Sequence, residues 1–323
     1  MRLVRFTIGL GIGLILTSCA RNTTDSPGGG GGTADTGGST DAAGGTTSAG
    51  GSTDAAGGTT SAGGTSLGPA PGPPPSQNCT DVASDSKVLT SLNARFHVPV
   101  WGLDKDYLAQ ANWWHVFNQQ TVTVDGLSFS VANPAGAAST DNSPAGYPSF
   151  FIGSYAGYTS QGSNLPKQVS ALKSVYTVLS TNANSKGYAN YNVAYDVWFT
   201  STGTPLTTSQ STPGLGGAYL MVWLFKPTNR QPRGSNAYPG QAVSGLPGTW
   251  DVWVDRTNPP CISYVSTTPL EKLAYDLNGV IRDAVTKGYG ITNSMYLSVI
   301  FGGFEIWGGG DGLQAKAFCA NVL

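Results

Sequence analysis

The sequence has little charge. Only 11% of its 323 residues are charged, and its acidic side chains include just two glutamates, Glu271 and Glu305. A typical soluble domain is about one quarter charged. The 17 lysines and arginines form no block or stripe, and the formal net charge is -1. This distribution argues against a general nucleic-acid-binding protein, so we expect no nucleic-acid partner.

Histidine is also scarce. His97 and His115 have no Cys or His neighbours at metal-ligand spacing, which disfavours a zinc site on residue supply alone. The glycine run at 308–310 does not link a strand to a helix, as a phosphate-binding or dinucleotide-binding loop would require. We therefore expect neither a metal nor another cofactor.

No apolar run is long enough for a membrane-spanning helix. The N-terminus instead reads as a secretion signal, with Arg2 and Arg5 ahead of a short apolar run at 6–16. The residues LTSC at 16–19 resemble the bacterial lipobox, and an ordinary signal peptide with an incidental cysteine is the alternative. The resemblance implies that residues 1–19 form a lipoprotein signal and that Cys19 carries the lipid anchor. In such lipoproteins Ala20 in place of aspartate favours the outer membrane or cell surface.

Residues 20–78 predict a disordered tether. The segment 22–75 holds 17 of the 45 glycines, and the unit STDAAGGTTSAGG occurs twice in succession, at 39–51 and 52–64. This unit has no apolar face to bury, so it is typical of a flexible linker rather than a solenoid repeat. The remainder, 79–323, has a suitable size for one all-β domain.

The domain sequence predicts many short strands and one helix. Runs rich in Val, Tyr, Phe, Trp and Thr alternate with turn residues, as in a sandwich or barrel. Six such runs are 121–124, 192–200, 219–225, 249–254, 262–265 and 296–301. Apolar residues at helical spacing predict a helix over 268–288, with Thr268 and Glu271 as a capping box and Gly288 at its end. We expect this helix to lie against the outside of a two-sheet sandwich.

Three cysteines remain in the domain if Cys19 is lipidated. For Cys79, Cys261 and Cys319, the simplest expectation in an exported protein is one disulfide and one free thiol, and three pairings are possible. A bond between Cys79 and Cys319 would tie the two ends of the domain together.

Several motifs recur along the predicted strands: NVAYDVWF at 192–199, AYLMVWLFKP at 218–227, TWDVWV at 249–254 and SVIFGGFEIWGGGDGL at 298–313, with GYPSFFIGSYAG at 146–157 and VPVWG at 98–102. In this order and spacing they resemble the motifs of glycoside hydrolase family twelve, the endo-β-1,4-glucanases and xyloglucanases. Their order and spacing cover most of residues 95–320. The resemblance implies an all-β, concanavalin-like β-jelly-roll sandwich with one helix on the outer face and a long cleft for a glucan chain.

The resemblance also assigns catalytic positions. The family uses two glutamates, because one group attacks or stabilises the anomeric carbon while another protonates the leaving oxygen. Glu305, in GFEIW, matches the acid/base, whereas Tyr219 stands at the position of the nucleophile. No small shift in register supplies a glutamate there, since Glu271 falls in the predicted helix. Asp196 matches the aspartate that lies beside the family's nucleophile.

Strand alternation predicts which side chains share the cleft with these groups. Met221 and Trp223 share a face with Tyr219, Trp198 shares one with Asp196, and Trp307 shares one with Glu305. Trp101, in VPVWG, matches a family tryptophan. The candidate sugar-binding residues are therefore Trp101, Trp198, Met221, Trp223 and Trp307. Ordinary core packing is the alternative for each aromatic residue.

Three functions fit these observations. The first is an exported glycoside hydrolase in which Glu305 is the acid/base and Asp196 activates either the Tyr219 phenol or a water. The second is a non-catalytic glycan-binding lipoprotein, and the third is a lyase for uronic-acid polysaccharides. Lys226, Arg230 and Arg233 would face an acidic sugar or form a solvated loop. We expect a β-glucan or related polysaccharide partner, a membrane contact through the lipid, and a monomer.

Overall fold

The structure is a computed structural model that describes residues 20–22, 85–91, 93–114, 120–132, 143–183, 190–207, 210 and 212–323. The signal peptide, Cys19, Cys79 and all but three residues of the expected tether lie outside the described residues. Those three residues form β1 (Ala20–Asn22), which pairs antiparallel with β13 (Arg230–Pro232). None of the described helices is long and apolar enough to cross a membrane.

Two large sheets make up the described domain. The smaller sheet has six strands in the order β17-β10-β19-β6-β5-β2. Its strands are β2 (Ser86–Leu89), β5 (Thr121–Asp125), β6 (Ser128–Ala132), β10 (Val175–Thr181), β17 (Lys272–Asp276) and β19 (Gln314–Val322).

The larger sheet has eleven strands. Nine follow the order β14-β15-β16-β12-β11-β18-β7-β4-β3, while β8 pairs with β7 and β9 with β18. Its strands are β3 (Arg95–Pro99), β4 (Asp106–Gln110), β7 (Ser149–Tyr155), β8 (Tyr158–Thr159), β9 (Lys167–Gln168), β11 (Val193–Thr200), β12 (Ala218–Phe225), β14 (Ser235–Gln241), β15 (Trp250–Asp255), β16 (Cys261–Ser266) and β18 (Tyr296–Gly303).

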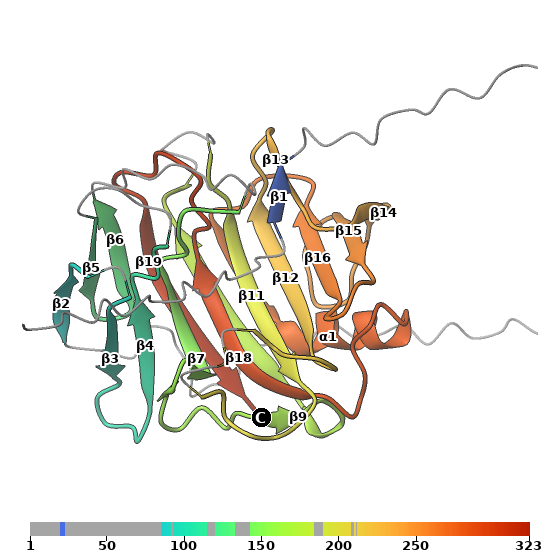
Figure 1. Ribbon diagram of the computed structural model, residues 1–323, viewed down its shortest axis with the longest axis horizontal. Helices are drawn as coiled ribbons and strands as arrows, with labels where there is room; N and C mark the ends of the chain where they lie inside the picture. Colours follow the sequence, from blue (N-terminus) through green and yellow to red (C-terminus); the bar gives the residue numbers. More distant parts are fainter. Residues whose placement is uncertain are drawn as a thin grey trace, which may run out of the picture. The chain divides into compact units, whose positions relative to one another are not determined.

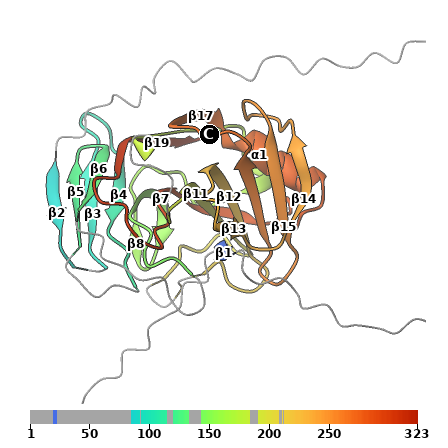
Figure 2. The same ribbon diagram turned by 90° about the horizontal axis from the view of Figure 1, so that it is seen from above.

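The two sheets stack as layers. Figure 2 shows β17 and β19 on one side of the sheet that contains β7, β11 and β12, and Figure 1 shows β19 overlapping that sheet. All six predicted strand segments are observed, with ends that differ by a few residues at most. The predicted all-β jelly-roll sandwich with a single α-helix is confirmed for the described residues.

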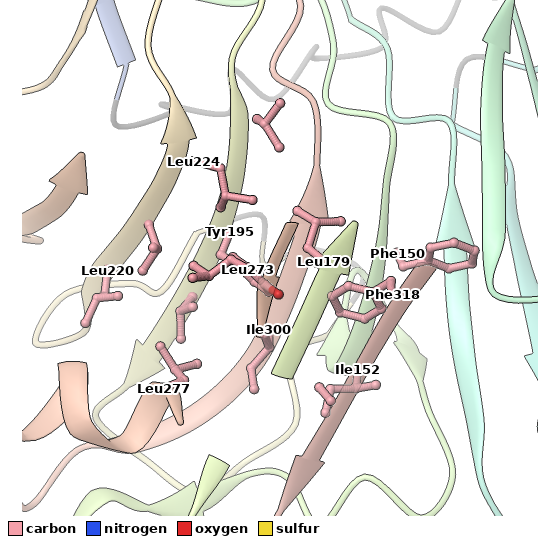
Figure 3. Close-up of a cluster of buried hydrophobic side chains, with 14 of the residues drawn as sticks. Phe150, Ile152, Leu179, Tyr195, Leu220, Leu224, Leu273, Leu277, Ile300 and Phe318 are labelled. Atoms are coloured by element: carbon pink, nitrogen blue, oxygen red, sulfur yellow. The ribbon is translucent and has the colours of Figure 1, made fainter. Parts of the chain in front are cut away.

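The strands of the larger sheet alternate between two buried faces. In β12, Leu220, Val222 and Leu224 join the core between the sheets, whereas the residues between them join a second cluster on the opposite side. We call the first side the core face and the second the site face. Figure 3 shows the core face, where Tyr195 of the larger sheet approaches Leu179 and Phe318 of the smaller one.

The predicted helix is too long and has the wrong cap. Residues Lys272–Asp276 form β17, which pairs with β10, and the helix α1 covers only Leu277–Thr286. Leu273 and Tyr275 alternate into the core along β17, so the apolar positions at the start of the segment follow a strand period. Asp276, rather than Thr268, caps the helix through the backbone N–H of Asn278.

The two described cysteines lie in different sheets. Cys261 begins β16 of the larger sheet, and Cys319 lies in β19 of the smaller one. Both are disulfide-bonded, and neither is free. The pairing of Cys79 with Cys319 and the lipidation of Cys19 involve cysteines outside the described residues and stay predictions.

Candidate active site

The site face carries a row of side chains at the centre of the larger sheet. Strand register places Asp196 of β11 opposite Met221 of β12 on one side and opposite Phe301 of β18 on the other. In the adjacent row, two residues along, Trp198 lies opposite Tyr219. Asp196 and Tyr219 are thus diagonal neighbours on one face, separated by roughly 7–8 Å between Cα atoms. The alternation predicted from the sequence places them together in this way.

Glu305 follows the end of β18 and is held by Asn192. The side-chain amide of Asn192 donates to Glu305 Oε2 at 2.5 Å, and its Oδ1 accepts from the Glu305 backbone N–H at 3.1 Å. The backbone N–H of Asn192 also donates to the Glu305 carbonyl oxygen at 3.0 Å. Glu305 is only 2% exposed, so this carboxyl is desolvated and fixed in direction.

Asp196 is a second buried carboxyl. Burial raises its pKa to about 7, and the Trp198 side chain and the Val197 backbone amide offset this effect only in part. Its Oδ1 is buried and has no hydrogen-bond partner. A carboxyl whose pKa lies near neutrality can accept or release a proton under physiological conditions, which is the property that a general base or acid needs.

Tyr147 lies near both buried carboxyls, Asp196 and Glu305. Burial, followed by the charges of Asp196 and Glu305, holds the pKa of the Tyr147 hydroxyl well above its ordinary value. This hydroxyl donates to the backbone oxygen of Ala194, on β11, at 2.9 Å. Tyr147 therefore lies near both acids and remains neutral between them.

Tyr219 lies among aromatic rings and an arginine. Its ring meets Trp198 edge to face, with 5.6 Å between ring centroids, and the Arg233 guanidinium lies 5.8 Å from the ring centre. Arg233 forms an ion pair with Asp255. No hydrogen bond joins Tyr219 to Asp196, although both are described. Proton transfer between them therefore requires a closer approach or a bridging water.

The predicted sugar-binding residues separate into two groups. Trp198, Met221, Trp223 and Trp307 belong to the buried cluster on the site face, and each is less than 5% exposed. Their rings and side chains pack on one another, which corresponds to the core-packing alternative. Trp101 differs, because it is 67% exposed in the turn between β3 and β4. Of this set, only Trp101 offers an open ring for a sugar.

Several site residues were not predicted from the sequence. Asn192 was read only as the first residue of a strand, and Tyr147 only as part of a motif, although both contact the catalytic region. Tyr155 packs edge to face on Trp198 and Phe301, at 5.3 and 5.2 Å between centroids. Arg95 lies 4.9 Å from the centre of the Tyr155 ring. The signal that could have found Asn192 is its position at the start of the strand that carries Asp196.

A two-sheet β-sandwich with two buried carboxyls on one aromatic face has the fold and residues of a carbohydrate-active enzyme. Comparison with known proteins identifies it more closely. Residues 105–323 match the sequence profile of glycosyl hydrolase family 12, and the chain belongs to this family. The VPVWG motif that contains Trp101 lies outside the matched range.

Individual proteins agree with this assignment. The chain is 30% identical over 161 residues to a probable cellulase, Cel12b, of Mycobacterium tuberculosis, which covers 50% of this chain and 99% of that protein. The solved endoglucanase Cel12A from Rhodothermus marinus is 29% identical, with a TM-score of 0.63 and coverage of 73% of this chain and 99% of that one. A solved endo-1,4-β-glucanase, CelB2, is 26% identical, with a TM-score of 0.62 and the same coverage.

Proposed function

We propose that this protein hydrolyses β-1,4-linked glucans, with Glu305 as the acid/base and with Tyr219 and Asp196 in place of the family's second glutamate. The observation that carries the proposal is the Glu305 carboxyl, fixed by Asn192 and located with Asp196 around the Tyr147 hydroxyl. The relatives named as a cellulase and as endoglucanases support a β-1,4-glucan as the substrate class. Glu305 and Tyr219 are each 2% exposed, so substrate entry requires groups over the site face to move.

The proposed reaction has two steps. The Tyr219 oxygen attacks the anomeric carbon while its proton passes to the Asp196 carboxylate, and the glycosidic C–O bond breaks as Glu305 protonates the leaving oxygen. Water then attacks the same carbon as Glu305 takes its proton, and Tyr219 is released and reprotonated. The alternative is one step, in which Asp196 takes a proton from water that attacks directly and inverts the anomeric centre.

A Tyr219→Phe variant separates these routes. Loss of the phenol oxygen abolishes the two-step route and leaves the one-step route largely intact. The anomeric configuration of the first product, followed by NMR, gives a second readout, because the two-step route retains the configuration and the one-step route inverts it.

The test of the hydrolase proposal is release of reducing ends from neutral and acidic β-glucans. We expect product from the wild-type chain, and much less from Glu305→Gln. Glu271→Gln is the matched control, since it removes the only other glutamate of the chain. Absence of product from every glucan at high enzyme loading would overturn the proposal.

A non-catalytic glycan-binding role is the second candidate, and Tyr219 favours it because a phenol is a poor nucleophile at neutral pH. Under this proposal the wild-type chain binds oligosaccharides without cleaving them. Restoring the acid with Tyr219→Glu would then produce activity. Hydrolysis by the wild-type chain at the rate of Tyr219→Glu would exclude this role.

We also propose that the protein is an exported lipoprotein, anchored through Cys19, with the glycine-rich residues after β1 as a linker. The lipobox-like LTSC and the glycine-rich repeats support this. Lipidation occupies one of the four cysteines, so the lipidated chain can form only one internal disulfide, whereas the unlipidated chain can form two. Mass spectrometry of the intact, non-reduced protein from membranes measures both the lipidation and the number of disulfides. An unlipidated chain, or one recovered only from the soluble fraction, would exclude the anchor.

A further inference from the structure

Arg230 is a buried cation that lies against the ring of Trp307. Its guanidinium lies 5.3 Å from the centre of the Trp307 ring, and Trp307 follows Glu305 by two residues. Arg230 is only 8% exposed, and its Nε is buried without a hydrogen-bond partner. Among the described residues, no carboxylate lies within ion-pair distance of Arg230. The charge at this point is therefore largely desolvated and not neutralised.

Hydrogen bonds connect Asn229, the residue before Arg230, to the segment that holds Glu305. The side-chain amide of Asn229 donates to Asn190 Oδ1 at 2.7 Å, and the carbonyl oxygen of Asn190 accepts from the Trp307 backbone N–H at 2.8 Å. Asn192, two residues later, holds Glu305. The segment 190–192 thus connects the residue before the arginine to the carboxyl, and the position of Arg230 is set by the fold rather than by a free surface loop.

Two more arginines lie along the aromatic rings of the site face. Arg95 lies against Tyr155, and Arg233 lies against Tyr219, with Trp198 packed edge to face between the two tyrosines. Asp255 neutralises Arg233, whereas Arg95, like Arg230, has no ion-pair partner among the described side chains. Two arginines without an ion-pair partner among the described residues, Arg95 and Arg230, therefore lie against the aromatic rings around the proposed catalytic groups.

A neutral glucan would not compensate the free-energy cost of burying these arginines. Its hydroxyl groups hydrogen-bond about equally well to neutral side chains, whereas a buried cation costs free energy unless an anion compensates it. The planar guanidinium matches a carboxylate with two parallel hydrogen bonds. Tyrosine as nucleophile fits the same substrate, because it carries less negative charge than a glutamate and repels a sugar carboxylate less.

We propose that the site takes a β-1,4-linked glycan that carries uronic-acid carboxylates, and that Arg230 binds one of these carboxylates next to Glu305. This inference rests on the proposed function for the β-1,4-glucan backbone and adds the charge of the substrate. Oxidation of C6 turns the hydroxymethyl group of each glucose into a carboxylate without changing the linkage. The acidic polymer therefore has the same backbone as cellulose.

The test compares two oligosaccharide series of equal length, cello-oligosaccharides and their C6-oxidised β-1,4-glucuronic acid counterparts. Calorimetry on the full chain measures affinity for each. We expect the wild type to prefer the acidic series by about tenfold or more, and the preference to decline with added salt. Arg230→Gln should remove most of this preference while affinity for the neutral series changes little.

Arg282→Gln is the matched control, since it removes an exposed arginine of α1 with the same change of charge. Arg230→Lys keeps the charge but loses the planar fork, so we expect an intermediate preference. If Arg230→Gln folds poorly, Arg230→Lys and the salt dependence of the wild type still decide the question. Equal affinity of the wild type for both series, or a preference that Arg230→Gln leaves unchanged, would overturn the inference.

The outcomes also separate this inference from the proposed function. Hydrolysis of neutral glucans without any acidic preference would keep the hydrolase and reject the uronate site. Acidic preference without hydrolysis would keep the uronate site and reject the hydrolase. Products with ultraviolet-absorbing unsaturated ends would likewise support uronate binding and replace hydrolysis with elimination.

Discussion

The two faces of the larger sheet are built from the same strands but handle polar atoms differently. On the core face, the Tyr195 hydroxyl bonds with Thr177 Oγ1 at 3.1 Å, and the Tyr264 hydroxyl donates to Asp283 Oδ2 at 2.9 Å. Tyr275 is an exception, since its buried hydroxyl has no hydrogen-bond partner. On the site face, by contrast, Asp196 retains a carboxyl oxygen that is buried without any such partner.

The difference shows where the fold tolerates instability. Core polar groups are usually paired, because an unpaired buried group costs free energy. The site face keeps a buried carboxyl whose pKa is raised to about 7 and a buried arginine without an ion pair among the described residues. Groups of this kind are expected where a ligand or a reaction uses them. The core face therefore serves stability, and the site face carries the groups proposed to act on a substrate.

The largest effect on activity should come from a substitution on the site face that leaves the fold intact. Glu305→Gln removes the proton donor but keeps the shape and the contacts with Asn192, so kcat should fall roughly 100-fold to 10,000-fold. Thermal unfolding should change little. Steady-state kinetics on a soluble β-glucan measure the first, and calorimetry measures the second. Retained activity would remove Glu305 from the chemistry.

The core face should show the opposite behaviour. Leu220→Ala creates a cavity between the sheets and should lower the free energy of unfolding by about 2–5 kcal/mol, with kcat/KM of the folded fraction unchanged. Met221→Ala is the matched variant, because Met221 is the next residue of β12 and is equally buried on the site face. We expect only Met221→Ala to change kcat/KM. Equal kinetic effects of both variants would contradict the division into two faces.

Asp196 should make stability depend on pH. Its pKa is 3.8 in the unfolded chain and about 7 in the folded one, so the contribution to stability is complete below pH 4 and is lost as pH rises through 7. Asp196→Asn lacks this dependence. Its stability relative to wild type should therefore increase by up to about 4 kcal/mol between pH 4 and pH 8. Denaturant unfolding at both pH values measures this, and a constant difference would disprove the raised pKa.

The pH dependence of kcat/KM should also depend on the protonation of Asp196. As a base, Asp196 must be deprotonated, so kcat/KM of the wild type should rise with pH through about 7. In the Asp196→Asn variant, kcat/KM should no longer rise with pH through about 7.

The smallest effect should come from Asn192→Ala. Loss of its hydrogen bonds leaves Glu305 less well oriented, and we expect kcat to fall about tenfold. Asn182→Ala is the control, because Asn182 bonds Gly312 and Gln314 beside the smaller sheet. An equal kinetic effect of both variants would make the role of Asn192 purely structural.

Local sequence patterns predicted much of the sheet but not the contacts between segments that are distant in the sequence. Alternation along β11 and β12 was enough to place Asp196 and Tyr219 on one face. The same reasoning failed at 268–276, where apolar residues fit both helical and strand periods and pairing with β10 decided for a strand. Asn192 was assigned no role, and the sequence left Arg230 open between facing an acidic sugar and a solvated loop, because their contacts with Glu305 and Trp307 join segments about 80 to 110 residues apart in the chain. Periodicity carries no information about such contacts.

The pairing of β12 with β16 has a consequence for how substrate preference can change. It is the parallel pair among the described strand pairings, so the chain must leave the sheet after β12 and return before β16 can lie beside it. The intervening excursion carries Arg230 and Arg233, while Asp196 lies in β11 and Glu305 follows β18. If the proposed roles hold, substitutions in the excursion can alter which sugars bind without disturbing the segments that carry Asp196 and Glu305. The topology would then let substrate preference evolve separately from the reaction.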